Sequence, residues 1–151
     1  MKIDQAHPLN AAVLRHLKSD TPAIAAPESH PDPYYDLGSH PDCVGRIWEE
    51  LNTALPVECR AIVYGTPSLV EPKSGVVIAL AYGTSYALRI PQGKRSDALA
   101  AGCKQGQRWS PGGSTDAETQ FGIGWVFGGW AKDEGVWLRE VVEEVQTLRV
   151  L

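Results

Sequence analysis

Histidine and aspartate residues in the first third of the chain form a pattern that can bind a metal ion. His30-Pro-Asp32 is followed by His40-Pro-Asp42, and Asp36 lies between them. Imidazole and carboxylate groups ligate divalent metals when a loop folds back and brings them together. The alternative is that each Pro-Asp pair serves a turn or a helix cap. Because a capping box over 39–42 accounts for Asp42, we expect the second role and predict no metal and no cofactor.

A basic segment from Arg89 to Thr115 is the second candidate site. It contains five cations and one acid, which gives a local charge of +4 in a chain of formal net charge -4. Trp109 can stack on a ring or a base, and Ser96 opens a predicted helix whose N–H groups can receive an anion. The alternative is a solvated surface loop. The candidate ligand-binding residues are Arg89, Lys94, Arg95, Lys104, Arg108 and Trp109.

Aromatic residues and glycines alternate along 121–130, which predicts a strand with one bare face. Gly122, Gly124 and Gly128 fall on that face. Glycine in a strand marks either close packing by another element or a groove that is open to a partner. The nearby tryptophans are core residues or interface anchors, and the candidate partner-binding residues are Trp125 and Trp130.

Three consecutive strands are predicted before this region. The ranges 57–64 and 86–90 alternate between apolar and polar residues, whereas 76–82 is almost continuously apolar. An almost continuous apolar run is typical of a central strand with little solvent exposure. Turn residues at 72–75 and 83–84 separate the strands.

Helices are predicted on either side of these strands. A first helix over 4–17 is capped by Asp4 or Asn10, and a second over 39–55 has Ser39 and Asp42 as a capping box and ends at Pro56. A short helix covers 96–101, and the last helix follows Asp133. We expect the last helix to leave four acidic side chains in water: Glu134, Glu140, Glu143 and Glu144.

These elements predict an α+β fold: an antiparallel sheet of four to five strands with helices packed on one face, in the order α-β-β-β-α-β-α. Residues 19–33 are rich in Pro, Ala, Ser and Asp and contain few large apolar side chains. We therefore divide the chain into an N-terminal helix and Pro-rich arm over 1–33 and a single α+β domain over 34–151.

The order of elements and four short motifs resemble the YjbR/MmcQ-like and TfoX N-terminal group. The motifs are an apolar strand over 75–80, an L-R-x-P strand end over 86–91, a Gly-Trp strand at 124–126 and a helix opening with Trp at 137–140. The resemblance covers about residues 40–148. It implies a small secretion-chaperone-like α+β domain, of bacterial type, with a regulatory or interaction role. The Pro-rich arm and the Gly-rich stretch 104–120 depart from that pattern.

Composition restricts the class of protein. The formal net charge of -4 argues against a general nucleic-acid binder. The odd number of cysteines, Cys43, Cys59 and Cys103, is typical of a reducing cytoplasm, and we expect no signal peptide and no membrane-spanning segment. All four histidines precede residue 41, so an enzyme would need the arm to lie across the sheet. We predict a non-enzymatic interaction or regulatory domain that binds a protein partner; the alternative is a domain that binds a small molecule or anion through residues 89–109.

Overall fold

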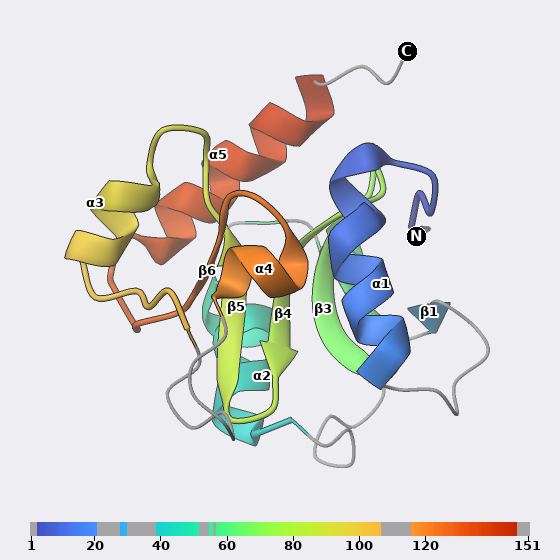
Figure 1. The fold of residues 1–151 in the computed structure, drawn as a ribbon, viewed down its shortest axis with the longest axis horizontal. Coiled ribbons are helices and arrows are strands. Elements are labelled where there is room, and N and C mark those ends of the chain that lie inside the picture. The colour runs from blue at the N-terminus through green and yellow to red at the C-terminus, as the bar shows by residue number, and fades with distance from the viewer. Residues whose placement is uncertain are drawn as a thin grey trace.

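The fold is an antiparallel sheet with helices on both sides (Figure 1). A computed structural model describes residues 3–20, 28–29, 39–51, 55, 57–106 and 116–147. The sheet contains six strands that lie side by side in chain order, each antiparallel to its neighbour. The strands are β1 (Glu28–Ser29), β2 (Arg60–Val63), β3 (Thr66–Glu71), β4 (Val76–Tyr82), β5 (Ser85–Arg89) and β6 (Trp125–Phe127). The predicted α+β class and antiparallel sheet are confirmed.

Strand β3 was missed by the sequence analysis. Its sequence, TPSLVE, contains a proline and mixes polar with apolar residues, so neither the period-two pattern nor the composition indicates a strand. The hairpin between β2 and β3 turns at Tyr64 and Gly65, both at positive φ (46° and 81°). That conformation matches the tight turns that join neighbouring antiparallel strands. Four consecutive strands, β2 to β5, therefore lie between residues 57 and 90, where three were predicted.

A β-bulge in β4 shifts the alternation of its side chains between the two faces of the sheet. Leu69 pairs with Ala79 and Val70 with Val77, so Ile78 is the extra residue. Ile78 and Ala79 consequently belong to one core, whereas Val77 and Leu80 belong to the other. Every residue of β3 is buried, and in β4 only the terminal Tyr82 is partly exposed. The prediction that 76–82 forms a central strand is thus confirmed.

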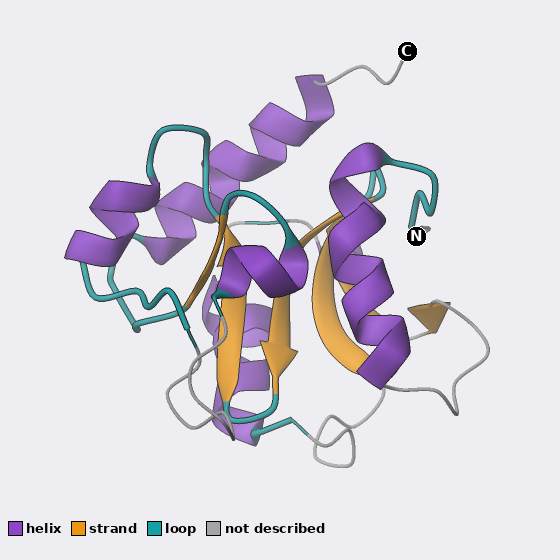
Figure 2. Ribbon diagram, in the orientation of Figure 1, coloured by secondary structure: helices purple, strands orange, loops and turns teal. Residues whose placement is uncertain are grey.

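Helices cover both faces of the sheet, and this corrects the prediction of one covered face (Figure 2). Helix α1 (Ala11–Asp20) and helix α4 (Ala117–Phe121) pack on one face through residues such as Leu17 and Phe121. Helix α2 (Pro41–Gly45), the π-helical turn η3 (Arg46–Glu50), helix α3 (Arg95–Ala100) and helix α5 (Glu134–Thr147) belong to the other. Two further turns are the 3-10 segments η1 (Pro8–Asn10) and η5 (Val57–Cys59).

The start of α1 is fixed to the sheet by one buried side chain. Asn10 Oδ1 accepts a hydrogen bond from Val77 N at 2.9 Å, and Asn10 Nδ2 donates to Gly75 O at 2.8 Å. The sequence placed this helix over 4–17, but it follows η1 and extends to Asp20. The arm predicted over 19–33 lies outside the described residues, apart from the end of α1 and strand β1. The division at residue 33 stays a prediction.

The predicted capping box before α2 is wrong. Ser39 Oγ donates to the buried carbonyl of Ala81 at 2.7 Å, so it does not cap the helix. The cap is His40, whose Nδ1 accepts from Asp42 N at 3.1 Å. A buried carbonyl needs a donor, and Ser39 supplies it, which leaves the neighbouring imidazole to accept from the N–H of Asp42.

The strand predicted from Phe121 is also wrong in its first half. Phe121 ends α4, and Gly122, at a φ of 112°, follows the helix as its C-cap. Ile123 is 89% exposed, and β6 begins only at Trp125. Because positive φ at Gly122 and Gly124 breaks the extended backbone, the alternation of residues there does not reflect a strand.

Candidate functional site

The carboxylate of Glu134 is the centre of a buried polar cluster. Glu134 is the first residue of α5 and is fully buried, which corrects the expectation that it stays in water. Oε1 accepts from the Tyr86 hydroxyl at 2.6 Å and from Arg46 Nη2 at 2.6 Å. Oε2 accepts from Gly129 N at 3.0 Å and from the Cys103 thiol at 3.4 Å. A buried carboxylate is tolerated only with such paired and hydrogen-bonded surroundings.

Three separate elements bring these groups together. Tyr86 comes from β5, Arg46 from η3 and Glu134 from α5. Gly128 permits the approach, because a Cβ there would lie 1.9 Å from the Tyr86 ring. Gly129 is equally confined, with the Gly102 carbonyl oxygen 2.0 Å from the position of a Cβ. Other parts of the chain fill the space next to each of these two glycines, so neither glycine opens onto a groove.

Trp130 covers this cluster from the outside. Its backbone lies in the left-handed region at a φ of 60°, and its N–H donates to the Tyr86 hydroxyl at 2.7 Å. The indole packs edge-on against Tyr86, with ring centroids 5.3 Å apart, and Arg46 Cζ lies 5.2 Å from the indole centroid. Arg46 Nη2 also donates to Ala131 O at 2.9 Å. Even so, Trp130 is 52% exposed. We call Arg46, Tyr86, Trp130 and Glu134 the Trp130 platform.

Electrostatics fix the protonation states of the donors. Burial raises the pKa of Tyr86, and its hydrogen bond to Glu134 raises it further. Burial and the charge of Glu134 raise the pKa of Cys103 to about 12. Burial alone would lower the pKa of Arg46, but its hydrogen bonds to Glu134 and Glu50 outweigh that effect and raise it. At neutral pH the phenol and the thiol are protonated, and the guanidinium is charged.

The other two cysteines are buried and free. Burial raises the pKa of Cys59 to about 11, with further increases from the charges of Glu71 and Glu58. Burial and then Asp42 raise the pKa of Cys43. Because the thiolate is the nucleophile, these thiols are held in their inert form, as expected for Cys59 from its position on an apolar face.

The described part of the basic segment does not form one surface. Arg89 is buried and donates to the carbonyls of Val77 and Leu9. Arg95 Nη2 donates to Asp116 at 3.2 Å, and Arg95 Nε lies 3.6 Å from Glu118. Lys94 and Lys104 are exposed. Arg108 and Trp109 lie outside the described residues.

The two predicted partner-binding tryptophans have different environments. Trp125 is fully buried, with its ring against Phe121 and below the Arg89 guanidinium, so it is a core residue. Trp130 is exposed at the surface. Of the predicted metal cluster, the structure describes His40 and Asp42, while His30, Asp32 and Asp36 fall outside. In the described part of the chain, no three His, Cys, Asp or Glu side chains gather as a metal site.

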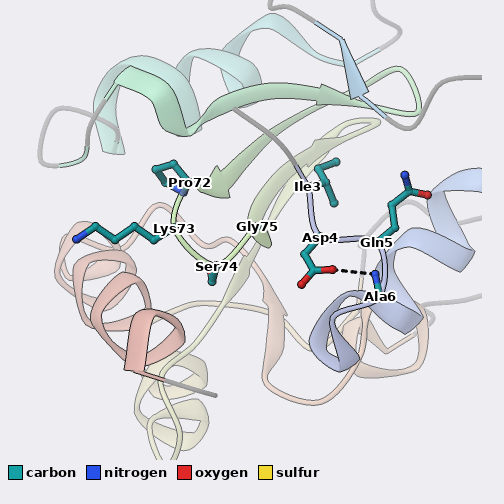
Figure 3. Close-up of a pocket in the computed structure, with 8 residues that line it drawn as sticks. All are labelled: Ile3, Asp4, Gln5, Ala6, Pro72, Lys73, Ser74 and Gly75. Carbon is teal, nitrogen blue, oxygen red and sulfur yellow. Dashed lines mark hydrogen bonds between the residues drawn. The ribbon is translucent and has the colours of Figure 1, made fainter. Parts of the chain in front are cut away.

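The surface of the described residues is also hollowed at places apart from the platform. One hollow, of about 500 Å³, lies between the N-terminal segment and the turn after β3, and Figure 3 shows Lys73 pointing away from Asp4 there. Asp4 is engaged locally, since it accepts from Ala6 N at 3.0 Å. Another, of about 400 Å³, lies where η1 and α1 approach the turn at Gly122, and Arg89 lines it.

Sequence reasoning missed most of the platform. Arg46 and Tyr86 carry no motif, because the residues they meet are 88 and 48 positions away. Glu134 did have a signal: it lies three and four residues before Trp137 and Leu138, so it shares their buried helical face.

The chain was compared with protein-family models, curated proteins and solved structures, and none of them matches it. No helix within the described ranges has the length and apolarity to cross a membrane.

Proposed function

We propose that this chain is a non-enzymatic interaction domain that binds a protein partner through Trp130. The observation that carries the proposal is the left-handed backbone of a half-exposed tryptophan. A bulky residue in this conformation costs on the order of 1–3 kcal/mol, and such outliers cluster at functional sites. The hydrogen bond to Tyr86 and the packing of the indole offset part of this cost, yet Trp130 stays 52% exposed.

The platform holds the indole in one position before any partner arrives. The Tyr86 hydroxyl accepts a hydrogen bond from the backbone N–H of Trp130. The Arg46 guanidinium lies over the indole and donates to the carbonyl of Ala131. Binding then needs little further ordering of this side chain, which otherwise costs about 0.5–1.5 kcal/mol. Tryptophan is also among the residues most enriched at the energetic centres of protein interfaces.

The chemistry of the platform is suited to supporting Trp130 and not to catalysis. Both oxygens of Glu134 already accept hydrogen bonds from protein donors. Tyr86 and Cys103 have raised pKa values, so neither supplies an anionic nucleophile at neutral pH. The cluster is therefore a support for Trp130 in this proposal.

The surroundings of Trp130 indicate what the partner presents. Lys132 and Asp133, which follow in the chain, are both exposed, and Val136 in the first turn of α5 is 40% exposed. An apolar centre with a polar rim is the usual composition of a protein interface. The partner we propose places an apolar side chain on the indole and polar groups against the Lys132–Asp133 pair.

The test is affinity capture with three forms of the purified chain: wild type, Trp130→Ala and Ile123→Ala. Ile123 is the control because it is more exposed than Trp130 but lies outside the platform. A partner recovered in stoichiometric amount is then purified, and its Kd is measured with each form. We expect Trp130→Ala to weaken binding by about 30-fold, the effect of losing roughly 2 kcal/mol at an interface centre.

Ile123→Ala should leave that Kd unchanged. Equal affinity of wild type and Trp130→Ala would remove Trp130 from the interface. If no partner is recovered in stoichiometric amount, the hypothesis of a protein-interaction domain is contradicted. A domain that binds a small ligand would then be favoured.

A further inference from the structure

The groove beside η1 contains a buried cation. The groove has a volume of about 400 Å³ and lies between the start of α1 and the Gly122–Gly124 turn. Arg89, at the end of β5, lines it and is only 6% exposed. Arg89 Nε donates to Val77 O at 3.1 Å, and Nη2 donates to Leu9 O at 3.0 Å.

The remaining nitrogen of Arg89 is free to bind a ligand. Within the part of the chain that the structure describes, Nη1 donates to no group. It is also not a fully buried atom that lacks a partner, so it opens onto solvent. Among the described residues, no carboxylate lies within ion-pair distance of Arg89. Only the more distant charge of Glu144 acts on it favourably.

An unpaired buried guanidinium is unusual, because buried charges are normally paired. Burial lowers the pKa of Arg89 to about 10, so the group stays charged at neutral pH and bears the cost of desolvation. Its position is nevertheless well determined by the two carbonyls and by the Trp125 ring, 5.1 Å from Cζ. An anion in the groove would supply the missing partner.

The walls of the groove indicate the rest of the ligand. Leu9 and Ala12 give it an apolar side, and Ile123 is held at its rim, 89% exposed. The turn that carries Ile123 is fixed by hydrogen bonds from Gly124 N to Glu118 and from Ile90 N to Gly124 O. Arg15 also lines the groove, is exposed and donates to no described group.

We propose that this groove binds a small carboxylic acid with an apolar body, whose carboxylate pairs with Arg89 Nη1 and Arg15 and whose body lies against Leu9 and Ile123. Arginine is the side chain best suited to carboxylates, and the groove volume falls within the range of small-molecule sites, about 300–1,000 Å³. The site is separate from the Trp130 platform: Arg89 stacks on Trp125 of the core under α1, whereas Tyr86 belongs to the core under α5, against which Leu9 also packs.

The test is a titration of the purified chain with hexanoate, with hexanamide as the uncharged control. Amide NMR signals and calorimetry report binding. We expect one saturable hexanoate site, signal changes at Leu9, Ala12, Arg89 and Ile123, weaker binding as salt is raised, and no binding of hexanamide.

Two variants that spare the buried Arg89 complete the test. Arg15→Ala should weaken hexanoate binding by about tenfold, the effect of losing roughly 1.4 kcal/mol of charge pairing. Arg139→Ala, which removes an exposed arginine from α5, should leave it unchanged. No hexanoate binding, equal binding of hexanamide, or equal losses in both variants would overturn the proposal. Binding of a peptide with a free C-terminal carboxylate, but not of hexanoate, would also overturn it and would identify a peptide site.

Discussion

The Tyr86 hydroxyl donates a 2.6 Å hydrogen bond to Glu134 Oε1, although the two residues are 48 positions apart in the chain. This bond joins strand β5 to the first residue of helix α5, inside the core. The same hydroxyl accepts from Trp130 N. One phenol oxygen therefore connects the sheet, the last helix and the exposed tryptophan, so changes to it should affect both stability and the shape of the platform.

Tyr86→Phe should destabilise the fold by about 1–3 kcal/mol. The variant keeps the ring, but Glu134 Oε1 loses a hydrogen-bond donor and the backbone N–H of Trp130 loses its acceptor. Glu134→Gln should cost about 3–5 kcal/mol, because it removes the charge that faces Arg46. Urea denaturation of both single variants and the double variant measures the coupling. We expect the double variant to be more stable than the sum of the two losses implies; strict additivity would show that the bond contributes nothing specific.

The sheet was predictable where its pattern was local. Continuous apolar residues over 76–82 indicated a central strand, and Gly75 before it and Gly83 after it indicated the turns. Strand β3 was not predictable, because its burial comes from neighbours on both sides and not from its own composition. Coverage of the sheet was predicted wrongly for one face only, although a strand that is apolar at every position requires a partner layer on each side.

The candidate site was less accessible to sequence reasoning for a physical reason. Glu134 was expected in water, and Arg89 was predicted to bind a ligand or to lie in a solvated loop. Both are buried and are held by groups far away in the chain. Long-range pairing of this kind leaves no spacing to detect in a single sequence. Trp130 was predicted, like Trp125, to be a core residue or an interface anchor, and its exposure and left-handed backbone were visible only in the structure.

Gly128→Ala should destabilise the fold by at least about 1–3 kcal/mol. The added Cβ would lie 1.9 Å from the Tyr86 ring, so either the ring or the β6 end of the backbone must move. The matched control is Gly45→Ala, because Gly45 has a helical φ of -59° and its Cβ would meet only Glu49, at 3.8 Å. That variant should gain about 0.5–1 kcal/mol. Thermal denaturation checks both, and losses of equal size would contradict the argument.

Glu71 should make stability fall in acid. Burial by itself raises the pKa of Glu71, but hydrogen bonds from Gln146 and from the amides of Lys73 and Ser74 outweigh it and lower the pKa below its ordinary 4.5. Below that value the unfolded chain binds more protons than the folded one. The stabilisation is therefore complete above about pH 4.5 and is lost as the pH falls through the folded-state pKa.

Comparison of wild type with Glu71→Gln isolates this contribution. At pH 7 we expect the variant to be less stable by about 1–3 kcal/mol, because hydrogen bonds to a charged acceptor are lost. That difference should shrink as the pH is lowered below 4.5, since the wild-type carboxylate is then protonated as well. Glu58→Gln, which changes an exposed carboxylate, is the control and should show little difference at any pH. If the difference in unfolding free energy between wild type and Glu71→Gln stays constant from pH 7 into acid, the charge of Glu71 has no part in it. The shape of the side chain would then account for its role in the turn after β3.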